Sequence, residues 1–380
     1  MIFLKLNENT DFNELCKIIC PDKIGQKIMQ KKIKIHFIYI KNIRTVAANI
    51  LKQDALRVGA ELVTHKEVVT AGISHSNALL MATCEQIEKL IKKEAMQDFG
   101  LKNLALFLQK QFIKPKKPKL MAVLNINKDS FNPKSRTDEK HFQSRLEELL
   151  ELKPEFIDIG AVSSRPGSVY CGVKEEFKRL KKSLDLIYAQ NYYKKAIFSL
   201  DSFDEYSLEY ALNKGFGLIN DISGLKNENL AKLACQYKAK YCLMHMQNEP
   251  YNMQDNPHYE DVLDELTQFF TQKLEILHKY GVKESILDVG IGFGKSAWHN
   301  MILIKHLGHF LQFDKPLLIG ASRKSVINAY FKSKVEERLP ASLYLHLKAF
   351  ENGASIIRTH DLYEHKQMFK LQSIMQELSL

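Results

Sequence analysis

The sequence predicts a (β/α)8 barrel, also called a TIM barrel, over residues 120–380, preceded by a small α/β or α+β N-terminal domain. Eight apolar, strand-like runs recur after residue 119, and helical stretches such as Lys174–Gln190 and Tyr259–Tyr280 separate most of them. Near-continuous apolar runs are typical of buried parallel strands. Eight such units in about 260 residues fit a closed barrel better than an open sheet. The predicted strands are Leu120–Ile126, Phe156–Ala161, Ala196–Leu200, Leu218–Ile222, Tyr241–Met246, Ile286–Val289, Pro316–Ala321 and Ala354–Arg358.

Residues 1–113 have a different pattern and contain no constellation that indicates catalysis. We expect an accessory domain of unassigned function there, a linker over residues 114–119, and the barrel over residues 120–380. The linker sequence KPKKPK combines prolines with like charges, which continue neither a helix nor a central strand. The elements predicted before it are an extended run at Ile33–Ile40, a helix at Thr45–Val58 that ends at Gly59, a strand-like stretch at Leu62–Ile73 and a helix at Cys84–Gln97.

The formal net charge of +11 is concentrated in the first third of the chain. Residues 1–119 hold 21 Lys and Arg against 11 Asp and Glu, which gives +10, whereas residues 120–380 hold 34 against 33, which gives +1. A balanced barrel is typical of a soluble enzyme. The basic third is compatible with nucleic acid or acidic partners. We favour a lysine-rich solvated surface and do not expect a nucleic-acid partner.

Cysteine usage and hydropathy indicate the compartment. The six cysteines are scattered without a CxxC pair, which indicates reduced thiols and neither a disulfide framework nor a zinc site. No apolar run is long enough to span a membrane, and the N-terminus lacks the pattern of a secretory signal. We therefore expect a cytoplasmic protein with no membrane association.

Polar residues stand at the predicted C-terminal ends of the strands, where barrel enzymes place their active sites. Asp201, Asn220 and Asp288 are short acceptors and amides, suited to the polar edge of a heterocycle. A second group on the last two strands is suited to an anion such as a phosphate or pyrophosphate. Its members are Ser322, Lys324, Arg358 and His360.

The stretch Ile286–Asn300 has Asp288 at a strand end, followed by three alternating glycines and Lys295. Its GFGKS segment lacks the first glycine of a P-loop, and its dinucleotide-like spacing occurs at a sixth strand, so we reject both interpretations. We expect the glycines to make room for Phe293 and a bound ring. Asn125, at the end of the first strand, is compatible with a Mg²⁺ ion that is held mainly by a diphosphate.

Seven segments in order resemble the motifs of dihydropteroate synthase, a folate-pathway family with a pterin-binding barrel. The resemblance covers residues 120–380 and leaves residues 1–119 outside it. Its segments are Met121–Phe131, Ile157–Ser168, Leu218–Gly224, Cys242–Pro250, Ile286–Lys295, Gly320–Ser325 and Ile356–Asp361.

The resemblance implies condensation of (7,8-dihydropterin-6-yl)methyl diphosphate with 4-aminobenzoate to 7,8-dihydropteroate and pyrophosphate. It further implies a homodimer, Mg²⁺ as the cofactor and sensitivity to sulfonamides. The catalytic residues would be Asp129, Lys324, Arg358 and His360, with Asn125 at the metal. The substrate-binding set would be Ser164, Arg165, Asp201, Asn220, Ile222, Met244, Asp288, Phe293, Ser322, Lys324, Arg358 and His360.

This chain departs from the family pattern at three places. It has Asn127-Lys128 where Thr-Pro is usual in the first loop, Val162 in place of a glutamate in the second loop, and Val289 in place of a proline after Asp288. None of these removes a residue of the pocket, so we expect activity with altered loop behaviour.

Two alternatives remain. A methyltetrahydrofolate:corrinoid methyltransferase would share the ring-binding residues, but it has no diphosphate for the residues around Ser322 and Arg358 to hold. A barrel without catalysis, serving as a scaffold or recruited to nucleic acid through the basic N-terminal part, is the other alternative.

Overall fold

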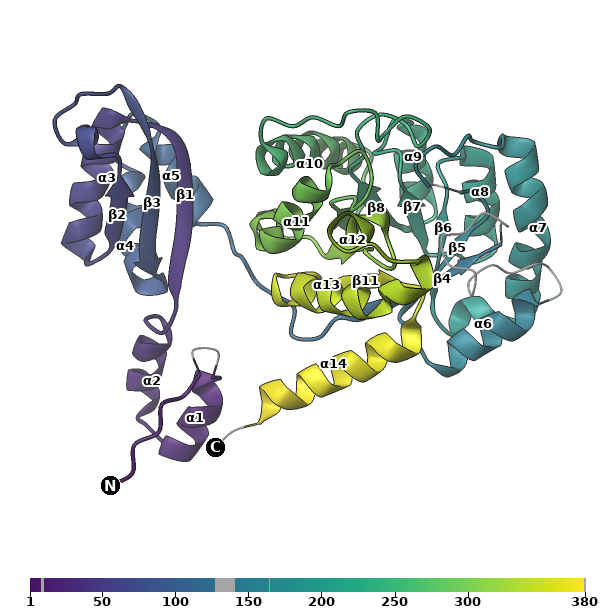
Figure 1. Ribbon diagram of the computed structural model, residues 1–380, viewed down its shortest axis with the longest axis horizontal. Coiled ribbons are helices and arrows are strands. Elements are labelled where there is room, and N and C mark those ends of the chain that lie inside the picture. Colours follow the sequence, from purple (N-terminus) through teal and green to yellow (C-terminus); the bar gives the residue numbers. More distant parts are fainter. Residues whose placement is uncertain (8–9, 127–140, 164, 379–380) are drawn as a thin grey trace. The chain divides into compact units, whose positions relative to one another are not determined.

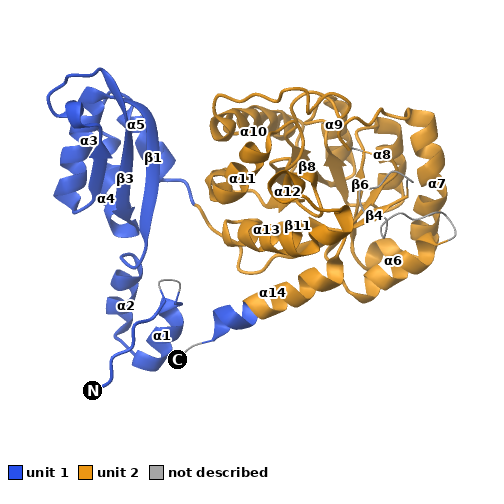
Figure 2. Ribbon diagram, viewed as in Figure 1, with its two compact units in different colours: residues 1–111, 373–380 blue, residues 112–372 orange. Residues whose placement is uncertain are grey.

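The computed structural model describes residues 1–380 apart from 8–9, 127–140, 164 and 379–380. The chain forms two compact units: unit 1 comprises residues 1–111 and 373–380, and unit 2 comprises residues 112–372 (Figures 1 and 2). No helix in the described part of the chain is long and apolar enough to cross a membrane.

Unit 2 is a closed barrel of eight parallel strands, which confirms the predicted fold (Figure 1). The strands follow one another around the barrel in chain order, and the last pairs with the first. They are β4 (Lys119–Asn125), β5 (Phe156–Gly160), β6 (Ile197–Asp201), β7 (Leu218–Asp221), β8 (Lys240–Met244), β9 (Ser285–Asp288), β10 (Leu317–Ile319) and β11 (Ile356–Thr359).

Helices surround the barrel, and alternation along each strand separates two cores. On β4, Leu120, Ala122 and Leu124 pack against the helices, whereas Met121 packs inside the barrel. The interior layer that includes Met121 is apolar and fills the barrel below the strand ends. The helices are α6 (Phe142–Glu151), α7 (Val173–Ala189), α8 (Glu205–Asn213), α9 (Asn229–Gln236), α10 (Val262–Lys279), α11 (Ala297–Lys305), α12 (Ser325–Tyr330), α13 (Leu339–Glu351) and α14 (Leu362–Glu377).

Unit 1 contains an antiparallel three-stranded sheet with the order β1-β3-β2. One face of the sheet packs on helices through an apolar cluster that includes Leu51, Leu62, Leu80 and Leu90. Its elements are α1 (Phe12–Ile19), α2 (Lys23–Gln30), β1 (Ile35–Arg44), α3 (Thr45–Val58), β2 (Glu61–Thr64), β3 (His75–Thr83), α4 (Cys84–Glu94) and α5 (Leu101–Leu108).

The sequence prediction for unit 1 was partly wrong. The helix at Thr45–Val58 is confirmed, with Gly59 in the left-handed conformation at its C-terminus. The strand-like stretch Leu62–Ile73 continues the strand only to Thr64, then enters a 3₁₀ turn, so its apolar residues mark a buried turn at Val68. The strand β3 follows this stretch and was not predicted, because short apolar runs do not separate strand from turn by periodicity alone.

A buried acidic pair lies between α3 and α4. Asp54 accepts hydrogen bonds from Arg57, Lys93 and Gln97. Glu94 is fully buried, and neither of its carboxyl oxygens has a hydrogen-bond partner among the described residues. Burial raises the pKa of Glu94 to about 7, and the nearby Asp54 adds to the shift. Glu94 is therefore protonated in the folded unit at acidic pH.

We predict that unit 1 loses stability as pH rises. The folded state holds the Glu94 proton more tightly than the unfolded chain, whose Glu pKa is 4.5. The stabilisation is therefore complete below about pH 4.5 and is lost as pH rises through about 7. Hydrogen exchange of the α4 amides in the full chain, measured between about pH 5 and about pH 8, should quicken with pH beyond the intrinsic rate. Glu94→Gln should remove this dependence.

Glu88→Gln is the matched control, because Glu88 lies on the same helix with its side chain 54% exposed. An unchanged pH dependence in Glu94→Gln, or its loss in the control as well, would contradict the assignment.

Candidate active site

The strand register brings four predicted or adjacent site positions to one level at the C-terminal ends of β4 to β7. Asn125 pairs with Gly160, Gly160 with Asp201, and Asp201 with Asn220. A Cβ at Gly160 would lie 2.8 Å from Oδ1 of Asn125, so a larger residue there would displace the Asn125 side chain. The side chains of Asn125, Asp201 and Asn220 therefore share one edge of the barrel mouth.

Asp158, which the sequence analysis missed, links these residues. It is fully buried on β5, two residues before Gly160, and its carboxylate accepts hydrogen bonds from Ser199 and from Nδ2 of Asn220 at 3.0 Å. Arg358 on β11 donates from Nε to Asp158 at 2.6 Å and from Nη2 to Asp201 at 2.7 Å. The guanidinium thus joins two carboxylates from neighbouring strands across the barrel.

The same ion pairs set the protonation of the site. Burial raises the pKa of Asp201, and the adjacent guanidinium of Arg358 opposes that shift. The two carboxylates raise the pKa of Arg358, which stays charged. A short, charge-assisted bond from Arg358 to Asp201 favours the ionised carboxylate as the acceptor for a ligand N–H group.

Asp288 and Lys324 form the opposite wall. Asp288 is buried and its Oδ1 accepts from the backbone N–H of Gly290 at 2.8 Å. Burial raises the pKa of Asp288, and the charge of Lys324 opposes the shift. Burial also lowers the pKa of Lys324 to about 8. Nζ of Lys324 donates to the carbonyl of Ile291 and lies 4.4 Å from the centre of the Phe293 ring.

An apolar cluster lies at the mouth of the barrel beside these polar groups. The predicted residues Ile222, Met244 and Phe293 pack together, and the buried Met253 joins them. Phe203 and Met246 pack against the cluster with partial exposure. Sequence reasoning missed Met253 and Phe203 because both lie in loops, where an apolar residue carries no periodic signal. It placed Met246 in a predicted strand, which the structure ends at Met244.

Ser322 and His360 lie together as predicted, on the loops after β10 and β11. Oγ of Ser322 lies 3.0 Å from Nδ1 of His360 and also accepts from its backbone N–H at 3.4 Å. Burial, together with the charge of Arg358, lowers the pKa of His360 to about 3. His360 is therefore neutral at physiological pH and offers an anion an N–H group and no positive charge.

The glycines after Asp288 were predicted to make room for Phe293 and a bound ring, but two of the three allow close approach of another loop instead. All three have positive φ. A Cβ at Gly290 would lie 2.0 Å from the carbonyl oxygen of His245, and one at Gly294 would lie 2.5 Å from that of Gln247. These two glycines therefore admit the backbone of the loop after β8. Gly292 alone faces a site residue, because its Cβ would lie 3.2 Å from Lys324.

Lys295 fixes the two loops to each other. Its Nζ is buried and contacts Nδ1 and the carbonyl of His245 at 3.0 and 3.1 Å, the carbonyl of Gly290 at 3.1 Å and that of Phe293 at 2.9 Å. Because these contacts occupy the amine, it is not available to bind a phosphate, which agrees with the rejection of a phosphate loop. Burial lowers the pKa of Lys295 to about 7.

Several predicted positions lie in or beside parts of the chain outside the described residues. Asn127, Lys128, Asp129 and Ser164 are among the residues not described. Arg165 is half-buried, and Gly167 donates a backbone hydrogen bond to the carbonyl of Pro250 at 2.9 Å. The second loop thus reaches the loop after β8, which carries Met253.

The profile of the pterin-binding enzyme family matches residues 121–360. A dihydropteroate synthase of Haemophilus influenzae is 35% identical over 259 residues, which cover 67% of this chain and 92% of the relative. The chain belongs to the dihydropteroate synthase family.

Two further comparisons concern the whole chain and the barrel. A bifunctional dihydropteroate synthase/dihydropteroate reductase of Helicobacter pylori is 42% identical over 380 residues, covering 99% of this chain and 100% of the relative. The crystal structure of Yersinia pestis dihydropteroate synthase in a sulfonamide drug complex aligns with a TM-score of 0.64 and 29% identity, covering 69% of this chain and 95% of that one.

We predict that Asp158→Asn weakens pterin binding although Asp158 lies below the strand ends. The substitution leaves the buried guanidinium of Arg358 with one carboxylate, and it replaces the charged acceptor of Asn220 and Ser199 by a neutral amide. Breaking a buried ion pair costs about 3–5 kcal/mol, and a loss of about 3 kcal/mol in affinity corresponds to a factor of about 100. Calorimetric titration with a pterin measures the change.

Ser199→Ala is the matched control, since it removes only the hydroxyl that donates to Asp158. Ser199→Ala should weaken the free energy of pterin binding by about 1 kcal/mol. Equal affinities for the wild type and Asp158→Asn would show that the network does not organise the pocket.

Proposed function

We propose that the barrel condenses (7,8-dihydropterin-6-yl)methyl diphosphate with 4-aminobenzoate and releases pyrophosphate. The observation that carries this proposal is the adjacency of two subsites at one barrel mouth. Asp201, Asn220 and Asp288 present acceptors and an amide over an apolar cluster, as the edge and faces of a pterin require. Ser322 and His360 present neutral donors next to the cationic Arg358, as a departing diphosphate requires.

In this mechanism the protein's residues bind and orient, and none forms a covalent bond with the substrate. Asp201, Asn220 and Asp288 accept from and donate to the pterin ring, while Phe293 and Met244 pack on it. Departure of the diphosphate leaves an electron-deficient methylene that the electron-rich pterin stabilises. The amine of 4-aminobenzoate then attacks that carbon and loses a proton. The buried Cys242 is unsuited to act as a nucleophile because burial raises the pKa of its thiol.

Magnesium fits the same site through Asn125. The described residues contain no group of three or more His, Cys, Asp and Glu side chains arranged to hold a metal. Mg²⁺ commonly uses one or two protein oxygens together with phosphate oxygens, and Oδ1 of Asn125 is such an oxygen at the strand end. When bound, the ion would neutralise charge on the diphosphate. Asp129 and Ser164, predicted for the first and second loops, remain predictions outside the described residues.

Three further expectations belong to this proposal. A homodimer and sensitivity to sulfonamides rest on the resemblance, and a cytoplasmic location rests on the cysteine usage and the hydropathy of the sequence. The sulfonamide complex of the Yersinia pestis relative supports the sensitivity to sulfonamides. Sedimentation of the full chain tests the dimer.

The proposed reaction predicts pyrophosphate release that requires both substrates and Mg²⁺. Asp288→Asn should reduce turnover by at least about 100-fold. The buried carboxylate can accept hydrogen bonds through both oxygens, whereas the amide has one oxygen and one NH₂ group, which would face a donor of the ring. A coupled assay for pyrophosphate measures the rate.

Glu284→Gln is the matched control for that assay. Glu284 immediately precedes β9, at the opposite end of the strand from Asp288, with its side chain 66% exposed and paired with Lys240. Wild-type turnover is expected for it. Full activity of Asp288→Asn, or release of pyrophosphate without 4-aminobenzoate at the same rate, would overturn the proposal.

We infer a second activity, reduction of dihydropteroate, for the full chain. The relative that matches 99% of this chain carries a reductase in its name, whereas the Haemophilus influenzae synthase covers 67% of it. The residues beyond the shared barrel include unit 1, which the synthase fold does not need. Reduction requires a hydride donor, for which a nicotinamide dinucleotide is the usual class.

The full chain should therefore oxidise NADH or NADPH in a manner that depends on dihydropteroate. Loss of nicotinamide absorbance, with and without free flavin as a hydride carrier, measures the reaction. Asp288→Asn should leave this oxidation intact if unit 1 holds the reductase site. An absence of oxidation under all these conditions would contradict the inference.

A further inference from the structure

The loops after β10 and β11 carry site residues and buried network residues in alternation. Ser322 and Lys324 lie at the mouth of the barrel, whereas Ala321 and Arg323 bond to α13 and Arg323 also bonds to Asp361 in the loop after β11. At the end of β11 and just after it, Arg358 and His360 lie at the mouth, whereas Thr359 and Asp361 bond to His365 on α14. Any shift of the buried residues therefore moves the functional residue next to them.

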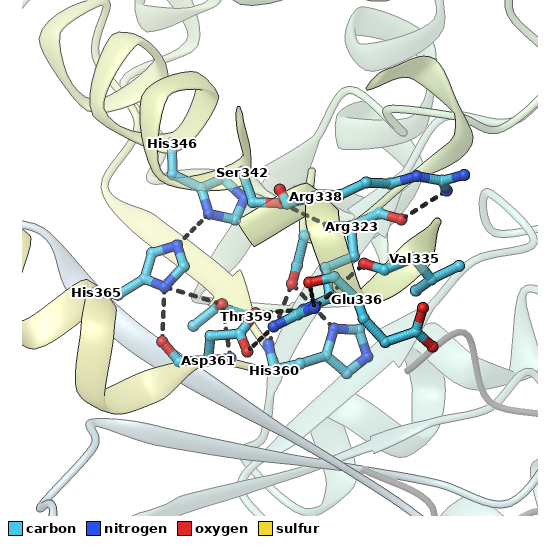
Figure 3. A network of polar contacts seen from close by, with 11 residues as sticks. Arg323, Val335, Glu336, Arg338, Ser342, His346, Thr359, His360, Asp361 and His365 are labelled. Atoms are coloured by element: carbon cyan, nitrogen blue, oxygen red, sulfur yellow. Dashed lines mark hydrogen bonds and ion pairs between the residues drawn. The ribbon is translucent and has the colours of Figure 1, made fainter. Parts of the chain in front are cut away.

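An ion pair links the two loops through their side chains. Arg323, which is 3% exposed, donates from Nε and Nη2 to the carboxylate of Asp361 at 2.8 and 2.7 Å (Figure 3). Its Nη1 donates to the carbonyl of Glu336 at 2.7 Å. Arg323 has a positive φ of 53°, which the bonds around it hold in place.

A second link joins the backbones of the two loops through a pair of histidines. The backbone N–H of Ala321 donates to Nε2 of His346 on α13 at 2.8 Å. Nδ1 of His346 lies 2.7 Å from Nε2 of His365 on α14, and Nδ1 of His365 lies 2.7 Å from the carbonyl oxygen of Asp361. Figure 3 shows the two imidazoles turned toward each other beside Thr359 and Asp361.

The two ends of this chain fix the tautomer of both rings. An amide N–H only donates, so Nε2 of His346 is an acceptor and its proton is on Nδ1. A carbonyl only accepts, so His365 has its proton on Nδ1 and accepts at Nε2. The three hydrogen bonds therefore all point the same way: Ala321 donates to His346, His346 to His365, and His365 to Asp361. An extra proton on either ring would set two donors against each other.

Both rings are fully buried, and their surroundings keep them neutral. Burial lowers the pKa of each imidazole. His365, Lys324 and His360 lower the pKa of His346 further. Around His365, the carbonyl and carboxylate of Asp361 and the carboxylate of Glu364 oppose the effect of burial, and Arg323 adds to it. Both imidazoles are therefore neutral at physiological pH, and each donates one hydrogen bond and accepts one.

We propose that His346 and His365 are positioning residues that set the spacing of the β10 and β11 loops and so assemble the leaving-group subsite. This inference rests on the proposed function for the identity of the anion. The pair ties the backbone amide next to Ser322 to the backbone carbonyl next to His360. It therefore controls the 3.0 Å contact between Ser322 and His360 without touching the substrate.

The test compares two double variants, one that can keep the hydrogen bonds from Ala321 to Asp361 and one that removes them. In His346→Gln/His365→Asn, the Gln oxygen replaces Nε2 as the acceptor for Ala321, and the Asn amide replaces Nδ1 as the donor to Asp361. In His346→Leu/His365→Leu, side chains of similar size fill the space without either bond. Inorganic pyrophosphate with Mg²⁺ probes the anion subsite, and 6-hydroxymethyl-7,8-dihydropterin, which lacks the diphosphate, probes the ring subsite.

We expect the Leu pair to bind pyrophosphate at least about tenfold more weakly and the pterin within about twofold of wild type. The Gln/Asn pair should recover most of the pyrophosphate affinity. Wild-type pyrophosphate binding by the Leu pair would overturn the proposal. A parallel loss for both ligands together with a lowered melting temperature would also overturn it, because it would indicate a merely structural role.

The same binding measurements separate this inference from the proposed function. If the wild type releases no pyrophosphate from the two substrates, the proposed reaction fails. The contrast between the Leu and Gln/Asn variants would then still establish positioning of an anion subsite. If the wild type turns over and the contrast is absent, only the positioning inference fails.

Discussion

The ion pairs of Arg358 with Asp158 and Asp201 are the interaction on which the site depends. Three charged groups from β5, β6 and β11 meet where water is largely excluded, and each is costly to bury alone. Together with the hydrogen bond from Asn220 they form a network that spans a large part of the barrel circumference. Because strands hold these residues, the network has a nearly fixed geometry before any ligand binds, which is the preorganisation that ring recognition needs.

Next to this network, close contacts between backbone segments fix the positions of the loops. Gly160 leaves space for Asn125, and Gly290 and Gly294 let the β9 loop pack on the loop after β8. The buried amine of Lys295 then binds three carbonyls from those loops. Each contact replaces a hydrogen bond to water that burial removes, so the loops are fixed by satisfied backbone groups. Phe293 and Lys324 take their positions from that arrangement.

Sequence reasoning located the fold and the polar residues at the strand ends because both follow from local pattern, whereas Ile222, Met244 and Phe293 came from the family resemblance. Buried parallel strands are apolar throughout, so a polar residue at the end of such a run is conspicuous, as at Asp201, Asn220 and Asp288. Asp158 was missed because it interrupts an apolar run in mid-strand, where its partner Arg358 lies 200 residues away. His346 and His365 were missed for a related reason. Each lies on a helix without any neighbouring motif, and only the packing of α13 and α14 brings their rings together.

Val289 stands where the family usually has a proline, and tertiary contacts fix the backbone there in place of the rigid proline ring. A proline there would restrict the backbone after Asp288 by itself. In this chain Val289 is fully buried against the helix layer, and Gly290 bonds back to Asp288 while it packs on the carbonyl of His245. Lys295 donates to the same carbonyl. The turn is therefore determined by the contacts of Gly290, His245 and Lys295, and the side chain of Val289 packs against the helix layer. We infer that the substitution leaves the position of Asp288 unchanged, because nothing that fixes this carboxylate depends on residue 289.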